Sequence, residues 1–232
     1  MEEVKIKEYY EKNPEGIEPI PEIPEIYEMH QLIRNSLSKI APYKLLDAGC
    51  GKGFTGKSVI EYCKEYHGMD LSSTAINFAK KRIPEGKFKV GTIREISYGN
   101  GEFDCILCSE VLEHVPEYKT AIKEMTRVLK SKGFLIITTP NKYNPDMALK
   151  LFTQGKYTSQ IYDSPIDYNE LFIDFKNNGL EIINFFSFWF FPSLGNLMNA
   201  PELQKHMKYL QQLSFKTGKP LGLYLFFVLQ KI

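Results

Sequence analysis

Short apolar runs alternate along this chain with stretches in which apolar residues recur every three or four positions. A short apolar run is typical of a buried strand, and the longer spacing is typical of a helix that packs through one face. Seven runs predict strands: Lys44–Asp47, Tyr66–Asp70, Lys87–Gly91, Phe103–Cys108, Phe134–Thr139, Leu180–Phe186 and Leu221–Leu229. This alternation favours an α/β fold, with a Rossmann-like doubly wound sheet that is mostly parallel and covered on both faces.

Helices are expected between the strands. Ser72 is suited to cap a helix that carries Ala75, Ala79 and Ile83 on one face. Pro116 is suited to open the helix before the fifth strand, with Gly133 just past its end. Further helices are predicted over Glu25–Ile40, Phe54–Tyr62, Tyr168–Asn178 and Glu202–Leu213.

Residues 45–53 hold the most informative motif, Leu-Leu-Asp-Ala-Gly-Cys-Gly-Lys-Gly. A strand ends at Asp47, and glycines at 49, 51 and 53 lead into the next helix. Glycines at such a turn let the backbone bend tightly and approach a ligand. The N–H groups at the start of the following helix are also free to bind a carboxylate or phosphate. The turn therefore predicts a cofactor site.

Two cofactor classes fit this turn. Gly51, Gly53 and Gly56 satisfy G-x-G-x-x-G, and Asp70 follows Gly51 by 19 residues, as in nicotinamide dinucleotide sites. Asp47 argues against that interpretation, because a carboxylate two residues before the first glycine would repel a pyrophosphate. An acid there suits a ligand with an ammonium and a sulfonium, which is S-adenosylmethionine.

The turn closely resembles motif I of the class I S-adenosylmethionine-dependent methyltransferases. Three further stretches are similar to this family in the right order between Lys44 and Asn141: His67–Ser72, Phe103–Val115 and Leu129–Asn141. Their sequences are closest to those of the ubiquinone-biosynthesis O-methyltransferase-like group. The resemblance implies an enzyme whose seventh strand is antiparallel and inserted beside the sixth.

The resemblance also implies which residues contact S-adenosylmethionine and its product S-adenosylhomocysteine. The glycine turn would pass the methionine part, Asp47 would receive its ammonium, and Asp70 would accept the ribose hydroxyls. Thr92 stands where many relatives place an acid against the adenine amine. The expected cofactor residues are Asp47, Gly49, Cys50, Gly51, Gly53, Asp70, Leu71, Thr92, Ile93, Ser109 and Glu110.

His114 is the candidate general base, because it follows the fourth strand closely and histidine titrates near neutral pH. The alternative is that His114 only fixes the loop and the helix entrance. In the small-RNA 2′-O-methyltransferases a comparable Glu, Glu, His set binds a divalent metal, and Glu110, Glu113 and His114 stand at those positions. Those enzymes supply another histidine, and residues 141–175 contain none here. A metal site would lack a ligand unless a carboxylate such as Asp146 or Asp163 replaces that histidine, so no metal is expected.

The acceptor is expected to be a small molecule, apolar or aromatic, that is methylated at oxygen. Residues 185–191 hold six aromatics in seven positions. They form either an acceptor pocket, lined by Trp189 and Phe190 with Tyr143, or a buried strand end, which is the usual place for dense aromatics. Two other functions stay open: an NAD(P)-dependent oxidoreductase with a Rossmann fold and a non-catalytic S-adenosylmethionine-binding protein.

Composition narrows the class of protein further. A net charge of +1 argues against a nucleic-acid partner, and no apolar run is long enough to span a membrane. With no signal peptide, a cytoplasmic location is expected. Cys105 and Cys108 form C-x-x-C within a strand, where positions i and i+3 face opposite sides and cannot easily chelate or bridge. The four cysteines are therefore expected to be small buried hydrophobes.

A single methyltransferase domain is expected over residues 1–232, a length that suits one α/β unit with additions. Residues 1–42 are expected to form an N-terminal lid, in which the proline-rich stretch Pro14–Pro24 lies extended and Tyr9 and Tyr10 are candidates to contact the cofactor. Residues 43–143 would form the cofactor-binding half. Residues 144–232 would form a substrate-side half, with insertions at 144–165 and 192–220.

Overall fold

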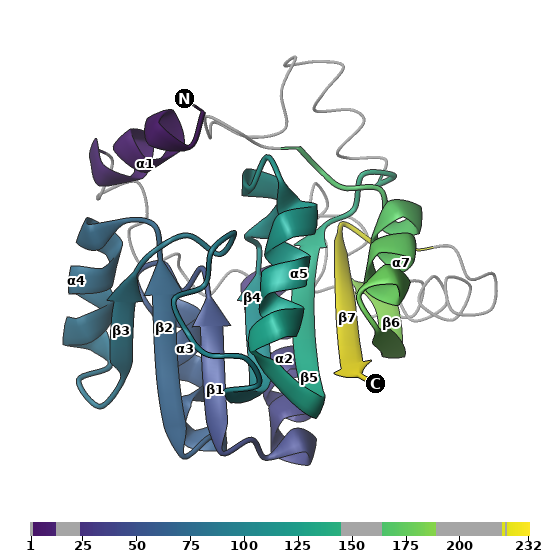
Figure 1. The fold of residues 1–232 in the computed structure, drawn as a ribbon, viewed down its shortest axis with the longest axis horizontal. Coiled ribbons are helices and arrows are strands. Elements are labelled where there is room, and N and C mark those ends of the chain that lie inside the picture. The colour runs from purple at the N-terminus through teal and green to yellow at the C-terminus, as the bar shows by residue number, and fades with distance from the viewer. Residues whose placement is uncertain (1, 13–23, 145–163, 189–219, 221) are drawn as a thin grey trace.

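A computed structural model describes residues 2–12, 24–144, 164–188, 220 and 222–232 of the chain. One seven-stranded sheet runs through it in the order β3-β2-β1-β4-β5-β7-β6 (Figure 1). The strands are β1 Lys44–Ala48, β2 Glu65–Asp70, β3 Lys87–Val90, β4 Phe103–Ser109, β5 Leu129–Pro140, β6 Leu180–Phe188 and β7 Tyr224–Lys231.

The expected fold class is confirmed, including its last strand. β1 to β5 pair in parallel with one another. β7 lies between β5 and β6 and is antiparallel to both. Because the four central parallel strands end at one edge, the residues that follow them come together there.

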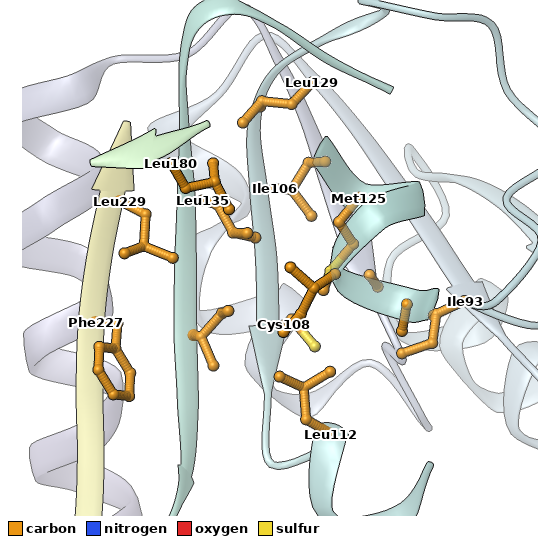
Figure 2. Close-up of a cluster of buried hydrophobic side chains, with 14 of the residues drawn as sticks. Ile93, Ile106, Cys108, Leu112, Met125, Leu129, Leu135, Leu180, Phe227 and Leu229 are labelled. Carbon is orange, nitrogen blue, oxygen red and sulfur yellow. The ribbon is translucent and has the colours of Figure 1, made fainter. Parts of the chain in front are cut away.

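Helices cover both faces of the sheet (Figure 1). One hydrophobic cluster joins α5 and α7 to the sheet, and Figure 2 shows Met125 of α5 beside Ile106 of β4. The other cluster joins α2 and α3 to the opposite face through Ile33, Leu45 and Val59. The helices are α1 Glu2–Lys12, α2 Pro24–Ile40, α3 Phe54–Val59, α4 Ser73–Arg82, α5 Tyr118–Val128 and α7 Tyr168–Asn177, with 3-10 turns η1 Ile60–Tyr62 and η2 Leu112–His114.

Several local predictions are confirmed. The Ser72 side chain caps α4 by accepting a hydrogen bond from Ala75 N at 3.1 Å. α7 ends at Asn177, and Gly179 beyond it has a φ of 69°, which favours glycine. Cys105 and Cys108 are free and buried in the two different clusters, so they point to opposite faces of the sheet as expected.

The boundary between α5 and β5 differs from the prediction. α5 begins at Tyr118 rather than at Pro116 and ends at Val128, so Gly133 lies inside β5 instead of ending the helix. Leu129 pairs with Phe103 of β4, and its carbonyl accepts a hydrogen bond from Lys231 Nζ at 2.7 Å. These partners from distant parts of the chain draw Leu129 into the sheet.

The N-terminal extension contains a helix, α1, that the sequence analysis missed. The helix predicted over Glu25–Ile40 is present as α2, one residue longer at its start. The helix expected over Phe54–Tyr62 is α-helical to Val59 and continues as the 3-10 turn η1. The predicted helix Glu202–Leu213, Trp189, Phe190 and most of the two insertions lie outside the described residues.

Candidate functional site

The candidate site lies where the order of the strands reverses, since β1 stands between β2 and β4. Ligands of doubly wound sheets bind beyond the carboxyl ends of strands at such a point. The residues that follow β1, β2 and β4 all carry predicted cofactor roles. The structure therefore brings together segments that are far apart in the chain.

The glycine turn after β1 is held by the end of β2. Gly49, Gly51 and Gly53 have φ values of 86°, 51° and 78°, in the left-handed region that favours glycine. Gly51 N donates to Asp70 Oδ2 at 2.8 Å. The other oxygen of Asp70 accepts a hydrogen bond from Ser72 N at 2.9 Å. Asp70 thus braces the turn and the start of α4 together.

Burial raises the pKa of the Asp70 carboxyl, against the opposing effect of its backbone hydrogen bonds. The negative charge of Glu11 acts in the same direction as burial. A carboxylate in this position gains from a ligand that brings hydroxyl donors or positive charge.

Asp47 at the end of β1 is only 2% exposed. Its Oδ2 accepts a hydrogen bond from the hydroxyl of Tyr66 at 2.6 Å. Burial raises the pKa of Asp47 to about 7, the bond from Tyr66 opposes that rise, and the charge of Asp70 adds to it. Tyr66 was not among the predicted site residues, although a hydroxyl-bearing residue in a strand predicted to be buried is a signal for a buried hydrogen bond.

A second set of polar side chains lies at the carboxyl ends of β4 and β5. The hydroxyls of Ser109 and Thr138 lie 2.9 Å apart, and both contact the sulfur of Met29 on α2 at 3.5 Å. Glu110 follows Ser109 with a φ of 56°. A residue other than glycine with such a φ carries backbone strain, and strained positions cluster at functional sites.

Glu113 and His114 lie in the 3-10 turn η2. The Glu113 side chain is only 1% exposed and accepts a hydrogen bond from Thr139 Oγ1 at 3.1 Å. His114 Nε2 lies 3.6 Å from Glu113 Oε1. Within the described residues, no group of three or more histidine, cysteine or acidic side chains is placed to hold a metal ion.

The remaining cofactor candidates lie after β2 and β3. Leu71 is half-buried, and Ile93 is buried in the cluster beneath α5. Thr92 Oγ1 accepts a hydrogen bond from Arg94 N at 3.3 Å. The roles of all three residues toward a cofactor stay predictions.

The described part of the aromatic run packs on β7. Phe185 stacks on Phe227 with ring centroids 4.7 Å apart, and Phe186 stacks on Phe226 at 5.1 Å. Residues directly opposite on neighbouring strands interact in this way. Both side chains are half-buried, whereas Phe188 at the end of β6 is only 1% exposed. The role of the run toward an acceptor stays a prediction.

Tyr143, the other predicted lining residue, is 51% exposed and its hydroxyl bonds to Asp167. A small cavity of about 160 Å³ lies nearby, between η2 and the start of α7. Its lining includes Leu112, Tyr118, Lys142 and Glu170, and nothing in the sequence pattern pointed to it.

Comparisons with known proteins agree with this geometry. Residues 46–137 match the family model described as a methyltransferase domain. Residues of this chain are 30% identical over 123 positions to a ubiquinone biosynthesis O-methyltransferase of Alkalilimnicola ehrlichii, across 51% of this chain and 49% of that protein. This chain therefore contains a methyltransferase domain of the class I S-adenosylmethionine-dependent kind.

Other relatives of this methyltransferase extend the comparison. An uncharacterised protein of Methanocaldococcus jannaschii is 29% identical over 180 residues, which cover 76% of this chain and 72% of that one. The crystal structure of geranyl diphosphate C-methyltransferase from Streptomyces coelicolor has a TM-score of 0.66 at 14% identity, over 100% of this chain and 98% of that one. This likeness shows the fold. This methyltransferase spans about half the length of its Alkalilimnicola relative.

Among the described residues of the chain, no helix is both long and apolar enough to cross a bilayer.

Proposed function

We propose that this chain transfers the methyl group of S-adenosylmethionine to an oxygen of a small apolar or aromatic molecule. The observation that carries the proposal is the contact between Gly51 N and the Asp70 carboxylate at 2.8 Å. It joins the glycine turn of β1 to the acid that ends β2, at the edge where doubly wound sheets bind ligands.

The side chains at this edge fit the proposed cofactor. Asp47 and Asp70 are both acidic, and each acts on the pKa of neighbouring groups as a nearby negative charge. A Cβ atom added to Gly51 would have no atom within 4 Å, so the turn leaves open space beside the Asp70 contact. Acids and open space suit an ammonium and ribose hydroxyls, and they disfavour the pyrophosphate of a nicotinamide dinucleotide.

Each residue then has a defined task. Asp70 would accept the ribose hydroxyls, Asp47 would receive the ammonium, and the backbone of the glycine turn would lie along the methionine part. Thr92 and Ile93 would border the adenine from β3. The bound cofactor supplies an electrophilic methyl group on a sulfonium. Alignment of an acceptor with such a group is itself worth several kcal/mol, about 7 or more in well-oriented systems.

An oxygen acceptor loses a proton as it is methylated, and His114 would take that proton. Glu113 supports the role, because its buried carboxylate lies 3.6 Å from His114 Nε2. Thr139 holds Glu113 in place through its hydroxyl.

The division of the chain follows from these tasks. Residues 43–143 would bind the cofactor, and residues 144–232 would bind the acceptor. Residues 1–42 would form a lid, since Glu11 of α1 bonds to Ser73 and Thr74 next to Asp70. The names of the ubiquinone biosynthesis O-methyltransferase relatives support an oxygen acceptor.

Calorimetric titration tests the cofactor assignment. S-adenosylhomocysteine, S-adenosylmethionine and the nicotinamide dinucleotides are titrated into wild type and Asp70→Ala. Micromolar binding of the adenosyl ligands, weakened at least about tenfold in the variant, is the expected result. Asp104→Asn is the matched control, because this acid lies at the opposite end of its strand and bonds to Lys130. Preferential dinucleotide binding would overturn the proposal.

A second experiment tests the acceptor. Enzyme with methyl-labelled cofactor is offered catechols, hydroxybenzoates and amines of similar size. Label in a phenolic ether supports oxygen methylation, whereas label on nitrogen or carbon alone contradicts it.

A further inference from the structure

Tyr66 reaches from β2 beneath the glycine turn to Asp47. The Tyr66 residue is 3% exposed, and its hydroxyl donates to Asp47 Oδ2 at 2.6 Å. The ring packs edge-on against Phe88 of β3, with centroids 5.9 Å apart. The hydroxyl is therefore held on the carboxylate by packing around the ring.

Gly56 makes room for this hydroxyl. A Cβ atom added to Gly56 would lie 2.1 Å from the Tyr66 oxygen and 2.6 Å from the ring carbon that bears it. No side chain can stand that close without displacing Tyr66. Gly56 is the third glycine of the G-x-G-x-x-G match. The packing of Tyr66 is enough to require a glycine at position 56, so this glycine is not evidence for a dinucleotide site.

Among the described titratable groups around Asp47, Tyr66 is the one that donates a hydrogen bond to its carboxylate. Asp70 faces Asp47 from the end of β2 and opposes its negative charge. The thiols of Cys50 and Cys108 also lie near Asp47, and burial raises their pKa values so that both remain neutral. Burial likewise raises the pKa of Tyr66, so it remains a hydrogen-bond donor.

We propose that Tyr66 is a positioning residue that holds the Asp47 carboxylate toward a cationic ligand group, and that binding of this group drives a proton off Asp47. The inference rests on the proposed function, in which the ammonium of the cofactor is that cation. Oδ2 is taken by Tyr66, which leaves Oδ1 for the ligand. Tyr66 thus selects for an amino-acid group at this end of the site.

The direction of the proton coupling follows from the charge. Without ligand, burial raises the pKa of Asp47 to about 7, so much of the carboxyl is protonated below neutral pH. A cation beside the carboxylate favours its ionised form. Binding below pH 7 therefore releases a proton, and affinity rises with pH until Asp47 is ionised in the free protein.

Calorimetry in buffers of different ionisation enthalpy measures this release. S-adenosylhomocysteine titrated at pH 6.5 is expected to release about half a proton or more, because that pH lies below the pKa of free Asp47. 5′-Methylthioadenosine, which lacks the amino-acid group, is expected to release none. Release that is equal for both ligands, or absent for both, would overturn the coupling.

Tyr66→Phe tests the positioning role. Loss of the hydroxyl removes the bond that favours the ionised carboxylate, so affinity for S-adenosylhomocysteine is expected to fall about 3- to 10-fold at pH 7. The difference should narrow toward pH 9, where Asp47 is ionised in both proteins. Tyr98→Phe is the matched control, because it removes a hydroxyl that bonds to His67 on the same strand.

The outcomes separate this inference from the proposed function. If wild type does not bind S-adenosylhomocysteine, the proposed function fails first. If wild type binds and Tyr66→Phe keeps the same affinity at every pH, Tyr66 only packs and the inference is wrong. Should Tyr66→Phe not fold, Asp47→Asn decides the coupling, since proton release must vanish in that variant.

Discussion

Glu11 at the end of α1 accepts hydrogen bonds from Thr74 and Ser73 in the first turn of α4. Glu11 Oε1 accepts hydrogen bonds from Ser73 N at 2.8 Å and Ser73 Oγ at 2.9 Å. Glu11 Oε2 accepts from Thr74 N at 3.2 Å and from the Thr74 hydroxyl. The N–H groups at a helix start lack partners within the helix, so this carboxylate caps α4 from a different segment. It holds α1 over the carboxyl edge of the sheet (Figure 1).

Glu11→Gln is expected to loosen α1. The neutral amide loses the charge-assisted bonds to the helix start. Backbone hydrogen exchange in α1 should then accelerate about 3- to 10-fold, while exchange in β4 stays unchanged. Lys7→Gln, on the exposed side of the same helix, is the control. Unchanged exchange in Glu11→Gln would show that apolar contacts alone hold α1.

Low pH is expected to release α1 in the same way. The hydrogen bond from Thr74 is the largest cause that lowers the pKa of Glu11 to about 2. Because the pKa is lowered on folding, the stabilisation is present above the ordinary value near 4.5 and is lost as pH falls toward 2. Limited proteolysis with an acid-active protease between pH 5 and 2.5 measures this release. Cleavage within α1 is expected to rise at a higher pH than that of global unfolding.

Asp47→Asn is expected to make the ligand-free protein more stable than wild type, by an amount that grows as pH rises. The pKa of Asp47 is raised on folding to about 7, so the native state binds more protons than the unfolded state between pH 4 and 7. Wild type therefore loses stability over that range, and the variant does not. Urea unfolding at pH 8 should show a gain of roughly 1–4 kcal/mol, at about 1.4 kcal/mol per unit of pKa. At pH 5 the gain should be smaller, and a difference that does not vary with pH would contradict the burial argument.

Asn141→Ala is expected to destabilise the junction of β5 and β7. The buried Asn141 amide donates to the carbonyls of Pro220 and Gly222 at 3.0 and 2.8 Å. Its removal leaves buried carbonyls without that donor, at a cost of about 1–3 kcal/mol. Thermal and urea unfolding measure the loss. Asn77→Ala on the exposed face of α4 should change stability by less than about 0.5 kcal/mol.

His114→Asn is expected to lower kcat for an oxygen acceptor by about 10²- to 10⁴-fold, the usual contribution of a general base. Binding of S-adenosylhomocysteine should stay within about twofold of wild type, because His114 acts on the acceptor. Glu113→Gln should lower kcat by less. The exposed Glu117→Gln of the same loop is the control. Equal kcat in wild type and His114→Asn would leave His114 a structural role only.

Local patterns along the chain predicted most of the sheet correctly. The strand-to-helix turn after Asp47, the cap at Ser72 and the end of α7 before Gly179 all depend on neighbours within a few residues. The physical preferences of glycine, serine and short apolar runs act over that range. The family resemblance added the antiparallel place of β7, which pattern alone does not specify.

The candidate site was predicted in part. Asp47, Asp70 and the glycine turn meet at the edge of the sheet as expected, because the carboxyl ends of parallel strands meet there. The exposed side chain of Tyr143 bonds to Asp167 and lies against Tyr168, and its role in lining an acceptor pocket stays a prediction. The aromatic run could not be assigned from its sequence, since its partners Phe226 and Phe227 lie about forty residues further on.

The sequence by itself determined the order of the seven strands along the chain and the acids that flank the glycine turn. Only the tertiary structure decided that Tyr66 bonds to Asp47, that Glu11 caps α4, and that Leu129 belongs to β5 rather than to the end of α5. Each of these depends on a partner 19 or more residues away. Local periodicity carries no record of such partners, because burial and hydrogen bonding between distant segments exist only once the sheet has formed.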